Sequence, residues 1–433
     1  MNGRSWGVIA LVVMLGLGLH QGVTFLSHRL MGRFSQSTAL QSEQKLTEIT
    51  SFSKEVTTEA NRPIPQDDPH LFSPSLSVPE SGRSLFLTPP PSLRSAVDFW
   101  RQIYAVYDFN QTVLHDSGDL SVIYGVLDFS SWDQQGLSEF EKEKAREKLI
   151  QAEIKRIGED LPLEAAERVR AQRGLKDKFG NAVKVSGKYL PLFEEIFEYY
   201  DIPMELTRLV FVESLFQERA QSKVGAVGLW QFMPGTARRY LQVGHLIDER
   251  YDPILATHAA ARLLKSNYEV LGEWPLAVTA YNAGVGTMQK AVSATGTTDL
   301  GTIIREYRGG VFGFASRNFY PSFLAAVEVF HHADQYLGFI QREEPLLFDF
   351  VALPARASFP QIAFWSGSNL KELSRLNPSY VREVARGVYL LPSGAKIRLP
   401  YGRSDVFKTR FMQYPSVPAD LALDYASIQT EIP

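Results

Sequence analysis

A single carboxylate interrupts an apolar stretch of the chain, residues 209–216, which read LVFVESLF. On a helix with 3.6 residues per turn, Glu213 would share one face with Leu206 and Leu209. A carboxylate walled by apolar side chains loses hydration, which disfavours its charged form and raises its pKa. Such a group can donate a proton near neutral pH. Taken alone, the segment favours a plainer interpretation, a helical glutamate at the stripe's edge whose carboxylate reaches water.

A second polar side chain, Gln231, lies within the segment GAVGLWQFMP at residues 225–234. Its two glycines, three residues apart, let the backbone approach another surface closely. A buried amide must be hydrogen-bonded, so Gln231 needs a fixed partner or a ligand. The alternative is a glycine-containing turn with core aromatics, and the segment alone favours it.

A third segment, AYNAG at residues 280–284, is predicted to end a helix that begins at Pro275, with Gly284 as its C-cap. Side chains at a helix end can reach into a cleft, so Tyr281 and Asn282 are candidates for ligand contact. The alternative is a capping asparagine and a core tyrosine.

Other functional classes receive less support. His115, Asp116 and Asp119 could form a metal cluster, but a predicted β-hairpin over residues 112–129 favours solvated turn residues there. The chain has no cysteine, which excludes disulfides, thiolate metal sites and a lipidated N-terminal cysteine. A net charge of −3 gives no support for a nucleic-acid partner.

Helices dominate the rest of the pattern. Residues 138–173 are predicted to be helical, divided at Pro162, and an amphipathic helix is predicted over residues 185–200. The helix that carries Glu213 is predicted to have Pro203 in its first turn and to continue through Phe216.

The three polar segments, in this order, resemble the catalytic domain of the bacterial lytic murein transglycosylases. In that family an E-S pair, a G-L-W-Q segment and an A-Y-N-A-G segment follow one another, and here they begin at Glu213, Gly228 and Ala280. Three ordered motifs over roughly 75 residues form a specific signal, unlike any one of them alone. The resemblance implies a mainly α fold, with a lysozyme-like catalytic domain over residues 186–340.

The resemblance also implies an activity on peptidoglycan. Glu213, as the single acid and base, would cleave the MurNAc–GlcNAc β-1,4 bond and leave 1,6-anhydro-MurNAc ends. Ser214 and Gln231 would orient Glu213 and the acetamido group, and Tyr281 and Asn282 would line the cleft. No metal or organic cofactor is needed. A tethered hydroxyl, with an effective molarity of roughly 10⁵–10⁸ M, can outcompete water.

One departure from the family concerns its fourth motif, a tyrosine after an Arg-Asn pair. Here Arg317 and Asn318 are followed by Phe319, and Tyr320 comes one residue later. One residue turns a helical side chain by about 100°. Tyr320 is therefore carried as a substrate-binding candidate that is out of register.

The N-terminal part points to the cell envelope. Residues 5–28 contain no charged side chain, which predicts a signal peptide or an uncleaved membrane anchor over residues 1–30. Residues 31–95, rich in Ser, Thr, Glu, Gln and Pro, are predicted to be a disordered linker. A helical N-terminal region is predicted over residues 96–185. We therefore expect a bacterial, periplasmic protein, with the membrane as a partner if the segment is uncleaved.

The C-terminal region, residues 341–433, is predicted to be α+β. A strand at 348–353, two short helices and a strand at 396–400 give a β-α-α-β order similar to a divergent LysM glycan-binding module. A structural appendage packed on the catalytic domain is the favoured alternative. Two alternatives to the transglycosylase remain open for the whole chain: a non-catalytic peptidoglycan-binding or scaffold protein, and a hydrolytic lysozyme.

Overall fold

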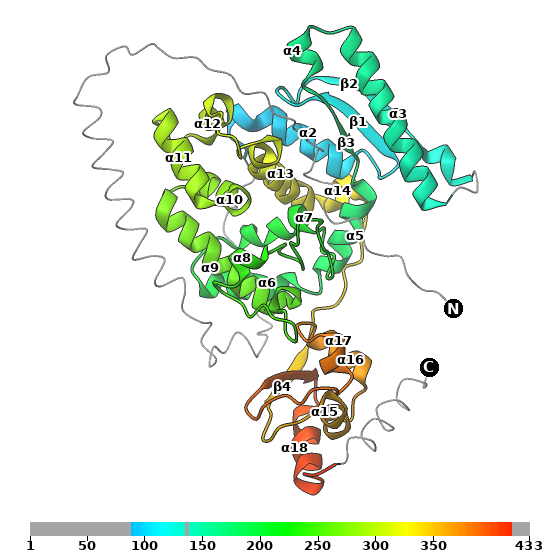
Figure 1. Ribbon diagram of the computed structural model, residues 1–433, viewed down its shortest axis with the longest axis vertical. Coiled ribbons are helices and arrows are strands. Elements are labelled where there is room, and N and C mark those ends of the chain that lie inside the picture. The colour runs from blue at the N-terminus through cyan, green and yellow to red at the C-terminus, as the bar shows by residue number, and fades with distance from the viewer. Residues whose placement is uncertain (1–87, 135–137, 418–433) are drawn as a thin grey trace, which may run out of the picture.

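The computed structural model describes residues 88–134 and 138–417, and its fold is mainly α, as predicted. Three lobes follow one another in Figure 1: a sheet with two helices, a central helical lobe, and a small C-terminal lobe. The signal or anchor predicted over residues 1–30, and most of the linker over 31–95, lie outside the described residues. Within them, no helix is long and apolar enough to cross a membrane.

The first lobe contains a three-stranded antiparallel sheet in the order β2-β1-β3. Its elements are β1 (Gln111–Asp116), β2 (Ile123–Asp128), η3 (Ser130–Gln134), α3 (Glu139–Glu159), α4 (Leu163–Ala166) and β3 (Val169–Arg173). The hairpin predicted over residues 112–129 is confirmed as β1 and β2. The helix predicted through residue 173 is wrong over β3, because pairing between Thr112 of β1 and Arg173 overrides the local helical pattern.

The central lobe contains most of the helices. They are η2 (Pro91–Leu93), α2 (Arg94–Ala105), α5 (Lys176–Ser186), α6 (Leu190–Tyr199), η4 (Met204–Arg208), α7 (Leu209–Glu213), α8 (Pro234–Ala237), η5 (Glu249–Tyr251), α9 (Pro253–Leu271), α10 (Trp274–Ala283), α11 (Val285–Thr295), α12 (Leu300–Glu306), α13 (Phe314–His331) and α14 (Ala333–Leu337).

Two helices far apart in sequence, α2 and α13, pack along each other in the core of the central lobe. Trp100 of α2 is fully buried and donates a hydrogen bond from Nε1 to Oδ1 of Asn318 at 3.1 Å. Because α10 also contacts α13, helix α13 packs against both the first long helix of the lobe, α2, and the later helix α10. This arrangement fixes α13 beside the C-terminal end of α10, where Tyr281 and Asn282 lie.

The C-terminal lobe contains β4 (Phe348–Ala352), α15 (Phe359–Ser366), α16 (Leu370–Leu376), α17 (Arg382–Ala385), β5 (Lys396–Pro400) and α18 (Ser404–Gln413). The two strands pair antiparallel, with Phe348 opposite Pro400, so the predicted α+β region has its strands where expected. Arg398 of β5 forms a buried ion pair with Asp252, the N-cap residue of α9, at 2.5 Å. This pair fastens the lobe to the central helices.

Candidate active site

Glu213 is the last residue of α7, so the helix predicted through Phe216 is shorter than expected. Leu206 and Leu209, on the turns before it, are fully buried. The helix ends here because Leu215 and Phe216 take left-handed backbone conformations, with φ of 49° and 55°. The acid therefore stands at the edge of the core, partly exposed, at the start of a turn.

The carboxyl of Glu213 has no hydrogen-bond or ion-pair partner in the part of the chain that the structure describes. Burial raises its pKa from 4.5 to about 8. The residue as a whole is partly exposed, but its carboxyl group is buried deeply enough for desolvation to set the direction of the shift. A carboxyl of this kind is protonated at neutral pH and can serve as a general acid.

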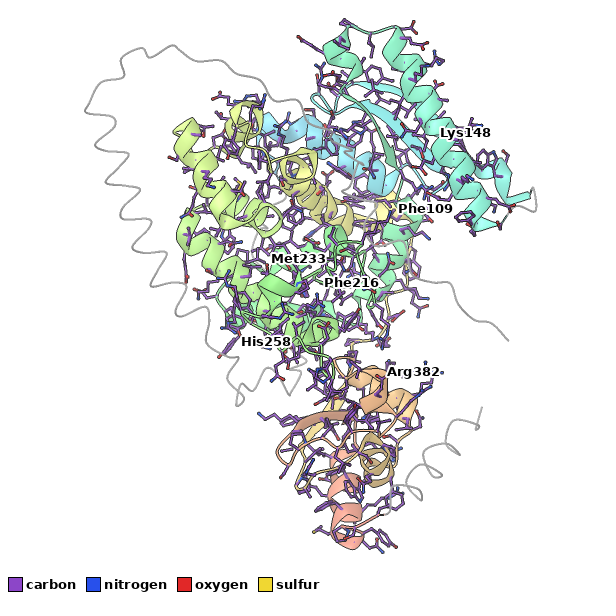
Figure 2. The ribbon with its side chains drawn as sticks, in the orientation of Figure 1. Phe109, Lys148, Phe216, Met233, His258 and Arg382 are labelled. Carbon is purple, nitrogen blue, oxygen red and sulfur yellow. The ribbon has the colours of Figure 1, made fainter. Side chains whose placement is uncertain are left out.

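Non-glycine residues in left-handed conformation are concentrated around Glu213. Besides Leu215 and Phe216, Gln231 has φ of 48°, and Asp201 completes the set in the described part of the chain. Each such residue costs about 1–2 kcal/mol. Packing holds the turn, because the buried ring of Phe216 lies against the ring of Phe211, with centroids 4.8 Å apart. Figure 2 places Phe216 and Met233 in the same part of the central lobe.

Gln231 is buried, and its amide is oriented by two backbone carbonyls. Its Nε2 donates to the carbonyl oxygens of Gly228 at 2.8 Å and Ala220 at 3.3 Å. These bonds fix which way the amide points, and they leave Oε1 buried without a partner among the described residues. An oriented, unsatisfied acceptor is a group that a ligand donor can complete. The fixed partners that the sequence predicted for this amide are the backbone carbonyls of Ala220 and Gly228.

Tyr281, at the end of α10, is electrostatically coupled to Glu213. Burial, and then the charge of Glu213, raise the pKa of Tyr281 well above its ordinary value. Its hydroxyl donates to the carbonyl oxygen of Trp230 at 2.8 Å. The ring stacks parallel to Phe319 of α13, with centroids 6.3 Å apart. The structure thus brings Glu213, Tyr281 and the segment that contains Gln231 together.

Three other predicted residues have distinct positions. Asn282 is exposed, and its Oδ1 accepts a hydrogen bond from Ser316 of α13 at 2.9 Å. Ser214 is buried, and its hydroxyl lies 3.4 Å from the carbonyl oxygen of Val210.

Tyr320 is buried with its ring 6.0 Å from Phe323. Phe319, and not Tyr320, lies against Tyr281. The sequence aligns Phe319 with the family tyrosine, and that alignment could have identified Phe319 as a neighbour of the site. Tyr320 was predicted as the site residue instead.

Ordinary glycosidases use a pair of carboxylates, but among the described residues no other carboxylate contributes to the pKa shift of Glu213, which burial alone causes. Glu218 follows closely in the sequence, but it accepts hydrogen bonds from Lys188, at 2.6 Å, and from the hydroxyl of Tyr189. Burial acts to raise the pKa of Glu218, and these hydrogen bonds outweigh it, so the net pKa is lowered. Glu218 is therefore a paired anion and not an acid.

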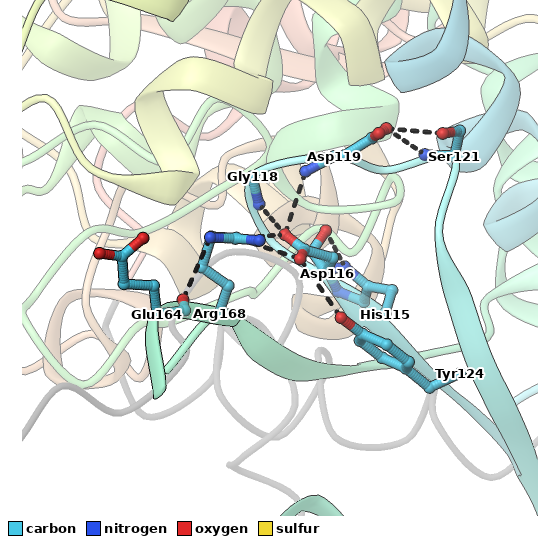
Figure 3. Close-up of polar contacts among 8 residues, drawn as sticks. All are labelled: His115, Asp116, Gly118, Asp119, Ser121, Tyr124, Glu164 and Arg168. Atoms are coloured by element: carbon cyan, nitrogen blue, oxygen red, sulfur yellow. Dashed lines mark hydrogen bonds and ion pairs between the residues drawn. The ribbon is translucent and has the colours of Figure 1, made fainter. Parts of the chain in front are cut away.

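The prediction of solvated turn residues is wrong for His115 and Asp116, which end strand β1 and are buried, whereas Asp119 lies exposed in the turn that follows (Figure 3). Asp116 accepts from the backbone of Gly118 at 2.7 Å and pairs with Arg168 at 2.9 Å. His115 is buried, and burial lowers its pKa to about 4. Within residues 88–134 and 138–417, no group of three metal-binding side chains forms a site.

Comparison with known proteins identifies the class of this domain. Residues 192–303 match the family described as Transglycosylase SLT domain, so the predicted resemblance to lytic transglycosylases is confirmed. That segment contains Glu213, Gln231 and Tyr281.

The relatives that match over a longer stretch include membrane-bound lytic murein transglycosylase D of Escherichia coli (strain K12) and of Escherichia coli O6:H1. Each is 27% identical over 180 residues, which cover 41% of this chain and 39% of the relative. A protein of Alteromonas sp. (strain M-1) named for tributyltin chloride resistance is 34% identical over 98 residues, 22% of this chain and 47% of that protein. The match thus spans well under half the length of the E. coli relatives.

Proposed function

We propose that this protein is a peptidoglycan lytic transglycosylase that uses Glu213 as its only acid and base. The observation that carries the proposal is an unpaired carboxyl with a pKa of about 8, coupled to Tyr281 within a transglycosylase SLT domain. The names of the E. coli relatives support murein as the substrate.

In the proposed reaction, protonated Glu213 donates its proton to the glycosidic oxygen between MurNAc and GlcNAc, and the C1–O bond breaks. The substrate's acetamido group stabilises the positive charge at C1, and Gln231 orients it. Glu213, now ionised, takes the proton of the muramyl C6 hydroxyl, whose oxygen closes onto C1. No water is consumed, Glu213 ends protonated as it began, and the product is a 1,6-anhydro sugar.

The position of the acid suits this sequence of steps. A carboxylate with few hydrogen-bond partners is a strong base once ionised, so it can retrieve a proton from a hydroxyl. Tyr281, which lies within electrostatic reach of Glu213, packs against Trp230, and such apolar rings favour attack by the substrate's own hydroxyl over attack by water.

The test is incubation of purified sacculi with wild type and with Glu213→Gln, followed by mass spectrometry of the released muropeptides. We expect anhydromuropeptides from the wild type and a loss of at least about 100-fold in the variant. The matched control is Glu143→Gln, which changes a carboxylate paired with Arg173 in the first lobe and should keep full activity.

Full activity of Glu213→Gln would refute the role of Glu213. Reducing muramyl ends from the wild type would identify a hydrolytic lysozyme, and binding without any turnover would identify a wall-binding or scaffold protein. The periplasmic location and membrane partner predicted above belong to the same proposal.

We further propose that the C-terminal lobe is a structural appendage that keeps a LysM-like element order. The support is its buried attachment through Arg398 and Asp252, together with backbone pairing between Asp248 and Ser379 at 2.8 Å.

A further inference from the structure

The turn that follows Glu213 is held in an unfavourable conformation by contacts with α6. Leu215 and Phe216 are both left-handed, and no glycine relieves them. Phe216 stacks with Phe193 of α6, their centroids 6.5 Å apart. An unfavourable turn persists only where its surroundings determine it, so the contacts on either side of the turn decide where Glu213 points.

A polar contact joins the same loop to the start of α6. Glu218 accepts from Nζ of Lys188 at 2.6 Å and from the hydroxyl of Tyr189. Tyr189 is itself buried and stacks on Phe193, with centroids 5.6 Å apart. The aromatic contact is made to α6 and the polar contact to the two residues that precede it, so the loop is held at two neighbouring points.

The far end of the loop leads to the amide of Gln231. The carbonyl oxygen of Ala220 accepts from the backbone N–H of Gly228 at 2.9 Å and from Nε2 of Gln231 at 3.3 Å. A movement of Glu218 is consequently transmitted in both directions, to Glu213 through the strained turn and to Gln231 through Ala220.

We propose that Glu218 is a positioning residue, which holds the loop of residues 214–220 so that Glu213 and Gln231 keep their orientation. The inference rests on the proposed function, since it assigns Glu213 and Gln231 to the reaction. Arg375 of the C-terminal lobe adds a second positive charge, besides Lys188, that acts on Glu218. Lys188 and Arg375 also line a cavity of about 340 Å³ whose lining includes none of the predicted site residues, so this anchor lies outside the site itself.

The test compares wild type, Glu218→Gln and Lys188→Met in steady-state assays on sacculi over a range of pH. We expect kcat to fall about 10-fold to 100-fold with little change in KM, because misplacement of a reacting group costs rate. The basic limb of the pH–rate profile should also move to lower pH by about one unit or more, since a loosened turn lets water reach Glu213. Glu143→Gln, which removes a paired carboxylate elsewhere, should change neither quantity.

A purely structural role would lower kcat through the folded fraction without moving the basic limb, and that result would overturn the proposal. The double variant should lose clearly less than the two single losses combined, because both single variants disrupt the contact between Lys188 and Glu218; full additivity would also overturn the proposal.

A ¹³C NMR titration of the Glu213 carboxyl gives a readout that needs no turnover. If the wild type lacks lytic activity but Glu218→Gln lowers the pKa of Glu213, the proposed function fails while the positioning role stands. An unchanged pKa of Glu213 in both variants refutes the positioning role alone.

Discussion

Replacing Glu213 by glutamine should change how the stability of the protein depends on pH. Burial raises the pKa of Glu213 from 4.5 to about 8. Between these values the folded protein holds a proton that the unfolded chain has released, so the free energy of unfolding falls as pH rises. The contribution is fully present below about pH 4.5 and is lost once the pH has passed about 8. Glutamine is neutral throughout and escapes this loss.

The size of the effect follows from the two pKa values. At 1.36 kcal/mol per pH unit, the full loss is about 5 kcal/mol, of which about 1 kcal/mol has occurred by pH 5 and about 3 kcal/mol by pH 7. A domain of this size gains roughly 1–2 °C in melting temperature per kcal/mol. The melting temperature of Glu213→Gln relative to wild type should therefore be about 4 °C higher at pH 7 than the same difference measured at about pH 4.5.

The assay is thermal or guanidinium unfolding of both proteins from about pH 4.5 to about pH 8.5, plotted as the difference between them. Titration of all other groups cancels in that difference. Glu153→Gln in α3 is the control: the hydrogen bond from Arg156 lowers the pKa of Glu153, so its stabilisation is lost only at acidic pH. A Glu213→Gln difference that is the same at about pH 5 and about pH 8 would show that Glu213 is not desolvated.

Two further predictions concern stability. Arg398→Met leaves the carboxylate of Asp252 buried without its partner, so the free energy of unfolding measured in denaturant should fall by about 3–5 kcal/mol. Adding Asp252→Asn, which keeps a helix cap, should recover part of that loss. An unchanged denaturation midpoint in Arg398→Met would contradict the buried ion pair. Gly228→Ala puts a Cβ 2.0 Å from the carbonyl oxygen of Arg250, whereas at Gly225, which also has positive φ, a Cβ meets open space. Gly228→Ala should therefore destabilise the protein more than Gly225→Ala does. Equal melting temperatures of the two variants would refute the close approach.

The sequence predicted the acid and its surroundings but not the end of its helix. The segments of Glu213 and Gln231 each favoured a plainer interpretation alone, and only their order with the AYNAG segment favoured a desolvated acid and an oriented amide. The left-handed turn at Leu215 and Phe216 contains no glycine, asparagine or proline from which it could be predicted. Tertiary packing on α6 stabilises this turn instead. For the same reason the partners of Glu218, which lie about thirty residues earlier and just before α6, could not be inferred from local pattern.

The strand β3 and the fourth motif show two other limits. Charged residues around β3 follow a helical pattern, and only pairing with β1, more than fifty residues earlier, makes Val169–Arg173 a strand. At the fourth motif, sequence register aligned Phe319 with the family tyrosine, but it could not show that Phe319 stacks on Tyr281 while Tyr320 packs against Phe323. In both places the outcome depends on which face a neighbouring element covers.

The pairing of α2 with α13 sets the order in which the chain can complete its core during synthesis. Trp100 emerges more than two hundred residues before Asn318, its hydrogen-bond partner. Until α13 has left the ribosome, α2 can pack on α5, through Tyr104 and Phe179, but the face that α13 covers lacks its native partner. The boundaries at which this chain could be cut into an independently folding piece therefore lie outside residues 192–303, at or before α2 and beyond α13.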